Sequence, residues 1–446
     1  MKRLLLLVFL LGSIATAQEV RLTIPYTRFQ LHNGLDVVLH EDHTTPAVSV
    51  NLWYHVGSSR EKPGRTGFAH LFEHLMFMGS PNVPQGKFDE WLESAGGDNN
   101  ASTSEDRTNY FEDVPSNALE LPLFLESDRL GYLPQAMTPE KVDLQRAVVK
   151  NERRQSYENR PYGMSEILLH DNLFPPDHPY HWPVIGSMED LSAASFQDVI
   201  DFFRKYYSPN NASLVIAGDI DPAKARILVG KWFDEIPAGV NVPPQSPLTV
   251  NVMEEKRVVA EDKVQLPRIY MAWVTPPQLA PGDAALDILS AVLAAGKNSR
   301  LYKRLVYDMQ IAQDVSAFQA SSGLASMFEI IVTARAGHTL KEIEAVVQEE
   351  LNKIKSEPPT LREVQRAINQ FEASFFRRIQ TVHDKADQLN GYLVATGDPD
   401  YFNEDLARYT SLDPSDVWSA ATTYLRDNGR VVLSIVPIGK RELGAQ

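Results

Sequence analysis

The chain has 446 residues, of which 43% are hydrophobic, so it can bury a large core and is long enough for two or more domains. Its formal charge of −15 makes nucleic acid a poor candidate partner, because phosphate binding requires clustered positive charge. The sequence contains no cysteine, which excludes disulfides as a source of stability.

The first residues have the pattern of a secretory signal peptide. Lys2 and Arg3 are followed by an apolar run over residues 4–12 and by the small-residue sequence Ala-Thr-Ala that ends at Ala17. We expect cleavage after Ala17, which would remove the signal peptide, residues 1–17, and export the protein to the periplasm or the medium. The apolar run is too short to span a membrane and no second long run follows, so the sequence predicts no membrane span.

Strand and helix patterns alternate through the first half of the chain. The predicted strands cover residues 28–42 (a hairpin), 48–56 and 99–114. The predicted helices cover residues 66–77 and 139–157. We expect Thr66 and Thr138 to cap these two helices at their N-termini, and Gly79 to end the first helix.

The second half repeats this mixture and is joined to the first by a proline-rich segment. Its predicted strands cover residues 268–274 and 327–333, and its predicted helices cover residues 338–355 and 361–378. Residues 238–256 hold three prolines and few periodic apolar residues, which predicts an extended linker.

The ends of the two halves resemble each other when they are aligned at one constant offset. Without gaps, both segments read as a helix, an asparagine turn and a β-rich strand. The matched pairs include Asp198 with Asp416, Tyr206 with Tyr424 and Asn210 with Asn428. We therefore predict an α+β fold of two similar tandem domains, over residues 18–237 and 257–446, each a mostly antiparallel sheet with helices packed on it.

Residues 70–74 read His-Leu-Phe-Glu-His inside the first predicted helix. Histidines four residues apart on a helix point the same way, and Glu73 shares their face. This helix is apolar nearly all round and should be buried, so its polar groups need partners. A divalent metal held by His70 and His74 would satisfy them, and the alternative is a helix with two ordinary histidines.

A catalytic zinc needs a third protein ligand and keeps one position open for water. Our candidate is Glu152, which follows Leu144 and Val148 at a spacing of four residues on an apolar stripe of its helix. The alternative for Glu152 is a surface ion pair with a neighbouring arginine. With a metal bound, Glu73 would be the general base that takes a proton from water and passes it to the leaving amine.

These residues resemble the pitrilysin and insulinase family of zinc peptidases, which includes the mitochondrial processing peptidase. The H-x-x-E-H pattern and the separation between His74 and Glu152 along the chain carry the resemblance. It implies one zinc per chain, bound by His70, His74 and Glu152, with Glu73 as the catalytic base. It also implies two halves of two α+β domains each, which face each other like a clam shell around a chamber for peptides or unfolded segments.

The resemblance extends to a strand for substrate binding. Residues 96–103 are similar to the edge strand beside the zinc in the family, where a peptide substrate adds as an extra strand through main-chain hydrogen bonds. Asn99 and Ala101 are the substrate contacts that this likeness implies.

Two features depart from the family pattern. Gln145 stands where many members carry a second glutamate that supports the metal ligands. Val306 and Gln313 stand where the partner half usually supplies an arginine and a tyrosine for the substrate and the oxyanion, although Arg304 or Tyr307 could substitute if the register slips. The resemblance therefore predicts a heterodimer with a homologous chain that carries this pair, and a homodimer is the alternative.

The predicted function is an exported zinc endopeptidase that hydrolyses peptides. One alternative is a non-catalytic scaffold or binding subunit of the same family, but such members typically lose the metal residues that this chain retains. Another is a non-haem iron enzyme with two histidines and a carboxylate, a chemistry in which Glu73 has no natural role.

Overall fold

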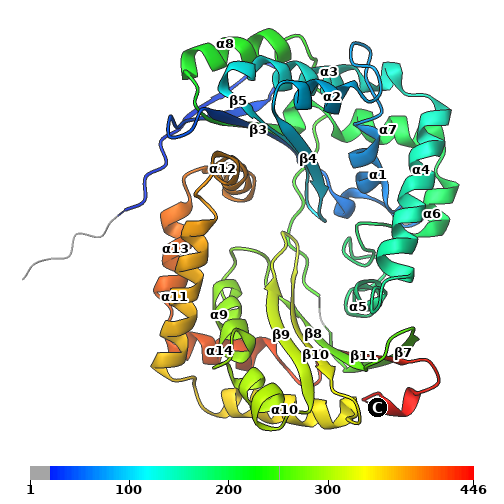
Figure 1. Cartoon of the computed structure of the whole chain (residues 1–446), viewed down its shortest axis with the longest axis vertical. Coiled ribbons are helices and arrows are strands. Elements are labelled where there is room, and N and C mark those ends of the chain that lie inside the picture. The colour runs from blue at the N-terminus through cyan, green and yellow to red at the C-terminus, as the bar shows by residue number, and fades with distance from the viewer. Residues whose placement is uncertain (1–20, 251, 446) are drawn as a thin grey trace, which may run out of the picture.

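The computed structural model describes residues 21–250 and 252–445, so the predicted signal peptide over residues 1–17 lies outside the described chain. Each half of the chain forms a β-sheet that is covered by helices, and the two sheets lie at opposite ends of the molecule (Figure 1). The α+β class with two similar units, predicted from the sequence, is confirmed.

The first sheet runs in the order β1-β2-β6-β3-β5-β4. Its strands are β1 (Thr27–Gln30), β2 (Asp36–Glu41), β3 (Ala47–Tyr54), β4 (Asp98–Thr103), β5 (Thr108–Pro115) and β6 (Ala212–Gly218). Strands β2 and β6 are parallel, and the other neighbours are antiparallel. The predicted hairpin is β1–β2, and Gly34 in its turn has a φ of 92° that suits glycine.

Helices cover the first sheet and build its core. They are α1 (Phe68–Leu75), α2 (Lys87–Ser94), α3 (Glu120–Ala136), α4 (Pro139–Arg153), α5 (Ser165–Leu173), α6 (Met188–Ala193), α7 (Phe196–Tyr206) and α8 (Pro222–Phe233). Single turns add η1 (Ser58–Arg60), η2 (Ser116–Ala118), η3 (Arg154–Glu158) and η4 (Pro209–Asn211). Apolar residues of α1, α3, α4, α7 and α8 pack with those of β2, β3 and β6 in one buried cluster.

The second sheet runs in the order β7-β11-β8-β10-β9. Its strands are β7 (Lys256–Asp262), β8 (Arg268–Thr275), β9 (Ala312–Ala320), β10 (Ser326–Ala334) and β11 (Val431–Pro437). The helices and turns of this half are α9 (Asp283–Ala294), η5 (Tyr302–Asp308), α10 (Leu340–Ser356), α11 (Leu361–Arg377), α12 (Val382–Thr396), α13 (Phe402–Thr410), α14 (Pro414–Tyr424) and η6 (Arg441–Leu443). Helices α9, α10, α11 and α14 share a second buried cluster with this sheet.

The duplication that pairs Asp198 with Asp416 is visible in the topology. Helix α7 and strand β6 correspond to helix α14 and strand β11. Strand β6 lies between its parallel neighbour β2 and its antiparallel neighbour β3, and β11 lies in the same way between β7 and β8. The halves are thus built alike, while the boundaries at residues 18–237 and 257–446 stay predictions.

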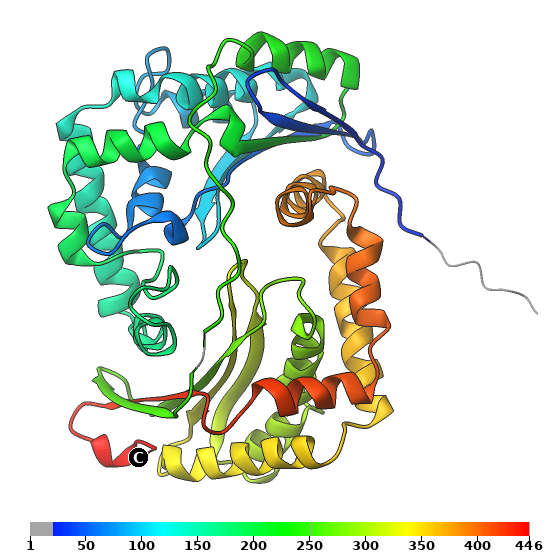
Figure 2. The same cartoon turned by 180° about the vertical axis from the view of Figure 1, so that it is seen from behind.

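Each half contributes one helix to the sheet of the other half. Helix α12 packs on β3 and β6 of the first sheet, and helix α5 packs on β8 and β11 of the second sheet (Figure 1). The connection from α8 to β7 runs between the halves, and its described residues form neither helix nor strand (Figure 2). The two sheets are therefore held together by exchanged helices as well as by the linker.

The predicted N-cap is correct for one helix and wrong for the other. Thr138 caps α4 by accepting a hydrogen bond from the N–H of Lys141. Thr66 does not cap α1, because its hydroxyl donates to Asp190 at 2.7 Å. The N-cap position is occupied by Gly67, whose φ is 86°. A long-range contact with α6 thus takes the side chain that local spacing assigns to the cap.

Candidate metal centre

Helix α1 carries the His-Leu-Phe-Glu-His pattern and is held by its apolar side. Leu71 and Leu75 are 0% exposed and belong to the core cluster of the first half. His70, Glu73 and His74 lie on the side of the helix that is partly exposed. Packing of the apolar face therefore directs the polar face towards α4 and β4, both of which contact α1.

A carboxylate from outside the helix holds the first turn of α1. The helix has no side-chain cap of its own. Instead, the Oε2 and Oε1 atoms of Glu61 accept the N–H groups of Gly67 and Ala69, each at 2.8 Å. Two amides that a helix start leaves free are satisfied in this way, next to the positive end of the helix dipole. Glu61 thus fixes the start of the helix that carries both histidines.

His70, His74 and Glu152 come together in space. The Nε2 atom of His70 lies 3.7 Å from Oε1 of Glu152, and the Nε2 atom of His74 lies 3.2 Å from Oε2 of the same carboxylate. One donor atom from each residue lies within 4.8 Å of the other two, and no other trio of histidine or acidic side chains in the described residues does so. Two imidazole nitrogens and one carboxylate are the ligand set of many catalytic zinc sites.

The face of α4 that meets α1 differs from the prediction. Leu144 and Val148, expected to form a buried stripe that leads to Glu152, are 51% and 41% exposed. The buried residues at 1% and 0% exposure are Val142 and Val149. The contact stripe is Val142, Gln145, Val149 and Glu152, at spacings of three, four and three residues. Glu152 therefore reaches the histidines by a helical repeat of seven residues rather than of four.

Gln145 lies on this contact stripe, beside the metal set. Its Nε2 atom donates to the Sδ atom of Met78 at 2.7 Å. The amide therefore supports the packing of α4 against the segment that follows α1, and its hydrogen bond goes to that segment rather than to Glu152.

Burial and neighbouring charges suit the three side chains to a metal. Burial lowers the pKa of His70, which favours its neutral imidazole, the form that offers a lone pair to a metal. The hydrogen bond from His74 lowers the pKa of Glu152 and keeps this carboxylate ionised. The adjacent Arg153 pairs with Glu158, so it does not form the alternative ion pair with Glu152. A neutral imidazole and an ionised carboxylate are the forms that bind zinc, so the states of His70 and Glu152 fit this metal.

Glu73 stands beside the metal set without belonging to it. Its Oε2 atom accepts a hydrogen bond from the Oγ1 atom of Thr103 at 2.6 Å. Thr103 is the last residue of β4, so the contact joins helix α1 to the edge of the first sheet. The carboxylate is held next to His74 and keeps its other oxygen for a reacting group.

Strand β4 is the edge strand of the first sheet and pairs with β5. The N–H of Ala101 donates to the side-chain Oδ1 of Asn100 at 2.8 Å rather than to β5. Because alternate residues of a strand point the same way, the main-chain groups of Asn99 and Ala101 lie on the free edge. The predicted substrate contacts therefore lie where another strand can add.

The segment expected to carry the arginine and tyrosine pair lies in the second half. Val306 is half-buried in η5, and Gln313 is exposed in β9. Arg304 forms ion pairs with two glutamates of α10, and Tyr307 is 73% exposed. Arg304 is therefore occupied within its own domain, whereas the Tyr307 side chain is free at the surface.

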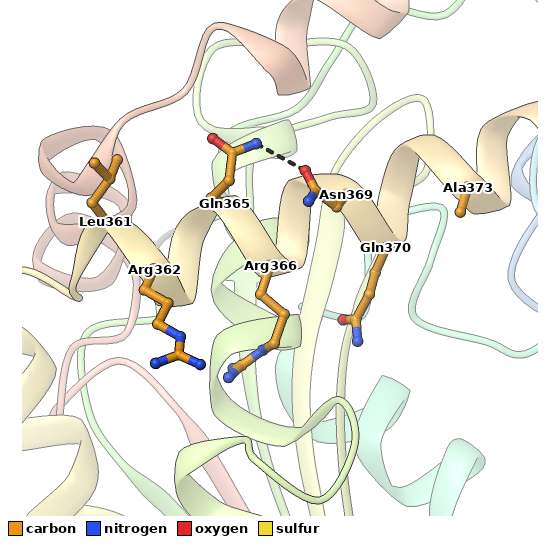
Figure 3. Close-up of a pocket in the computed structure, with 7 residues that line it drawn as sticks. All are labelled: Leu361, Arg362, Gln365, Arg366, Asn369, Gln370 and Ala373. Carbon is orange, nitrogen blue, oxygen red and sulfur yellow. Dashed lines mark hydrogen bonds between the residues drawn. The ribbon is translucent and has the colours of Figure 1, made fainter.

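A pocket of about 800 Å³ lies on helix α11 and is separate from the metal set. Figure 3 shows its residues: Leu361, Arg362, Gln365, Arg366, Asn369, Gln370 and Ala373. Its arginines extend from one side of the helix, while Gln365 donates to Asn369 on the other (Figure 3). None of the predicted site residues lines this pocket, so the candidate chemistry is not located there.

Two residues of the site, Glu61 and Thr103, have no local sequence pattern that connects them to it. Glu61 lies six residues before Gly67, outside the spacing of a capping box, so no local rule connects it to α1. Thr103 ends the stretch that resembles the edge strand of the family. Its contact with Glu73 depends on how α1 packs against β4, which spacing alone does not determine.

Two family models match the chain in tandem. The model of the insulinase family of peptidases, M16, matches residues 36–176, which include the H-x-x-E-H pattern and Glu152. The model described as the inactive domain of peptidase M16 matches residues 193–371. The chain belongs to this family, as the sequence resemblance indicates.

Relatives that cover most of the chain are named as a zinc protease and as a subunit of a processing peptidase. The zinc protease PqqE of Helicobacter pylori is 29% identical over 415 residues, which cover 91% of this chain and 92% of that protein. A probable mitochondrial-processing peptidase subunit beta of Arabidopsis thaliana is 23% identical over 441 residues, covering 95% of this chain and 80% of that protein.

Solved structures share the fold. A protease from Helicobacter pylori superimposes with a TM-score of 0.87 at 28% identity and covers 93% of this chain and 99% of its own. The periplasmic protease PqqL from Escherichia coli matches with a TM-score of 0.76 at 19% identity, over 94% of this chain and 48% of its own.

Within residues 21–250 and 252–445, we find no helix with the length and hydrophobicity that crossing a bilayer requires.

Proposed function

We propose that this protein is an exported zinc-dependent endopeptidase that hydrolyses peptides or unfolded segments. The observation that carries the proposal is the convergence of His70, His74 and Glu152 within 4.8 Å, with Glu73 directly beside them on the same helix as the histidines. The names of the relatives, zinc proteases of comparable length, support the same activity.

In this proposal His70, His74 and Glu152 hold one zinc ion per chain. Zinc bound there would polarise the scissile carbonyl and lower the pKa of a bound water to about 7. Glu73 accepts a proton from the attacking water on its carboxylate and delivers it to the leaving nitrogen of the peptide. Asn99 and Ala101 align the substrate as an added strand through their main-chain groups on the unpaired edge of β4.

We also propose that the chain works with a homologous subunit. The positions of the arginine and the tyrosine are occupied by Val306 and Gln313, and Arg304 is held in ion pairs with α10. A homologous chain that carries this pair would complete the oxyanion site. A homodimer is the alternative, with Tyr307 as its candidate contribution because that side chain is exposed.

The test compares the purified zinc-loaded chain with its Glu73→Gln variant on an unstructured, internally quenched peptide. We expect the wild type to bind one zinc and the variant to bind zinc equally well. We also expect the kcat of the variant to be lower by a factor of about 10² to 10⁴, the usual contribution of a general base. Removal of zinc by a chelator should abolish hydrolysis, and added zinc should restore it.

The outcomes separate the competing interpretations. Activity of the chain alone, lost in Glu73→Gln, would support the peptidase and rule out an obligate heterodimer. Activity that requires a homologous chain with the arginine and tyrosine pair would support the heterodimer. A chain that binds no zinc, or that binds zinc but remains inactive with such a partner, would favour the non-catalytic subunit.

A further inference from the structure

The carboxylate of Glu73 lies outside the metal set, so another group must set its direction. Its hydrogen bond comes from the Oγ1 atom of Thr103, 2.6 Å from Oε2. A glutamate side chain can occupy many rotamers, and a bond to one oxygen restricts them while leaving the other oxygen free. The threonine hydroxyl is thus placed to determine where the free oxygen points.

Thr103 belongs to the strand that the substrate is proposed to join. Strand alternation places its side chain on the same face as those of Asn99 and Ala101, the face next to α1. By the same alternation, its main-chain groups lie on the free edge with theirs. Strand β4 can therefore bind the peptide through the main-chain groups on its edge, while the side chain of Thr103 on its face contacts Glu73.

The end of β4 is braced from the opposite face of the sheet. The Nη1 atom of Arg107 donates to the carbonyl and the hydroxyl of Ser102, at 2.9 and 2.6 Å, and to Oδ1 of Asn109 at 3.1 Å. The guanidinium also lies over the ring of Trp53, 5.0 Å from its centroid. These contacts hold the residue before Thr103 and so limit the movement of its hydroxyl.

The turn after β4 is tied to the second half of the molecule. The Oδ1 atom of Asp106 accepts a hydrogen bond from the hydroxyl of Tyr180 at 2.6 Å, and its Oδ2 atom accepts one from the N–H of Gly323 at 2.8 Å. Gly323 lies in the turn between β9 and β10. The strand that carries Thr103 is therefore anchored to both sheets.

We propose that Thr103 is a positioning residue whose hydroxyl aims the general base Glu73 at the water, while the same strand holds the peptide. The inference rests on the proposed endopeptidase activity and deepens it, because it links substrate alignment on β4 to proton transfer on α1. It assigns a role to a residue outside the H-x-x-E-H pattern.

The test measures kcat, KM and zinc content for Thr103→Val, Thr103→Ser and Thr108→Val in the assembly in which the wild type is active. Valine keeps the shape and strand preference of threonine but cannot donate, so Thr103→Val should lower kcat by about 10- to 100-fold. We expect KM and zinc content to be unchanged, because the edge of β4 and the three ligands are intact. Thr103→Ser restores the donor and should recover most of the wild-type kcat.

Thr108→Val is the matched control. Thr108 faces Thr103 across the two strands, is fully buried, and donates its hydroxyl to the carbonyl of Val56 at 2.8 Å, away from Glu73. It should therefore lose stability while keeping kcat. An unchanged kcat in Thr103→Val, or an equal loss in Thr108→Val, would overturn the role of Thr103 and leave the peptidase standing. A wild type that hydrolyses no peptide in any assembly would overturn both.

Discussion

At the scale of single residues, burial favours the neutral form of both His70 and His55, and their neighbours give the two side chains different roles. Burial lowers the pKa of His70, which faces Glu152 and is suited to a metal. Burial also lowers the pKa of His55, to about 4. The Nε2 atom of His55 lies 3.1 Å from the hydroxyl of Ser213. Among the described residues, no carboxylate forms an ion pair with His55, whereas Glu152 lies beside His70. Burial thus lowers the pKa of both histidines, but His70 is a candidate metal ligand and His55 is a structural residue.

The neutral state of His55 predicts a pH dependence of stability. Its pKa falls from 6.5 to about 4 on folding, so between these values the unfolded chain binds a proton that the folded chain does not. The stability that the folded chain gains by keeping His55 neutral is fully present above pH 6.5 and is lost as the pH falls to 4. In His55→Gln, the free energy of unfolding should depend on pH less steeply in this window, by up to about 1.4 kcal/mol per pH unit.

Urea titrations of both proteins between pH 4 and pH 7 provide the measurement. Parallel stability curves for the wild type and His55→Gln would show that the histidine titrates alike in both states and would contradict the prediction.

At the scale of elements, helix α1, which carries the candidate metal ligands His70 and His74, is short and depends on groups outside it. An isolated helix of this length is unstable in water, so α1 is held by its buried face and by the carboxylate of Glu61 at its first turn. Helix α4, by contrast, carries its own cap in Thr138 and brings Glu152 in its last turn. The site therefore combines α4, whose cap comes from the adjacent residue Thr138, with α1, which depends on contacts from elsewhere in the chain.

We predict that Glu61→Ala weakens zinc binding although Glu61 is not a ligand. The change leaves the N–H groups of Gly67 and Ala69 without acceptors, which should lower the free energy of unfolding by about 1–3 kcal/mol. Looser histidines should raise the zinc dissociation constant about tenfold or more, measured by competition with a chromophoric chelator.

Glu363→Ala is the control for this experiment, because Glu363 completes the capping box of α11 and lies outside the metal set. It should reduce stability and leave the zinc dissociation constant at the wild-type value. Equal zinc affinity in the wild type and Glu61→Ala would count against the supporting role of this carboxylate.

At the scale of the whole molecule, the exchange of helices couples the two halves. Asn390 of α12 is fully buried against the first sheet, where its Nδ2 atom donates to the main-chain and side-chain oxygens of Asn51 at 3.1 Å each. Its Oδ1 atom accepts from the hydroxyl of Ser213 at 2.5 Å. An amide of the second half thus completes the hydrogen bonding of the first sheet.

We predict that Asn390→Ala loosens both halves. Unpaired buried groups should reduce the free energy of unfolding by about 1–3 kcal/mol. Hydrogen exchange should become faster in β3 and β6 as well as in α12, since these elements share the interface. The exposed Asn352→Ala serves as the control and should leave exchange unchanged. Faster exchange confined to α12 would contradict the coupling.

Much of the candidate site is readable from the chain because the signals are local. Histidines four apart in an apolar helix predict two candidate ligands and a candidate base, and the hairpin and the cap of α4 follow from residues next to each other. The repeat that pairs Asp198 with Asp416 predicts the matching sheet topologies. Glu152 is a candidate from the stripe it forms with Leu144 and Val148, but those two residues are exposed, so of the two signals only its separation from His74, typical of the family, is left.

The fold class, the internal duplication and the chemical character of the helix around residues 70–74 can be predicted from the chain alone, since these depend on periodicity and residue type. Contacts between distant segments make Glu61 rather than Thr66 the acceptor at the start of α1, join Thr103 to Glu73, and set which sheets α5 and α12 cover. The physical reason is that an apolar face or a free donor specifies that a partner is needed, whereas its identity depends on packing between segments far apart in the chain.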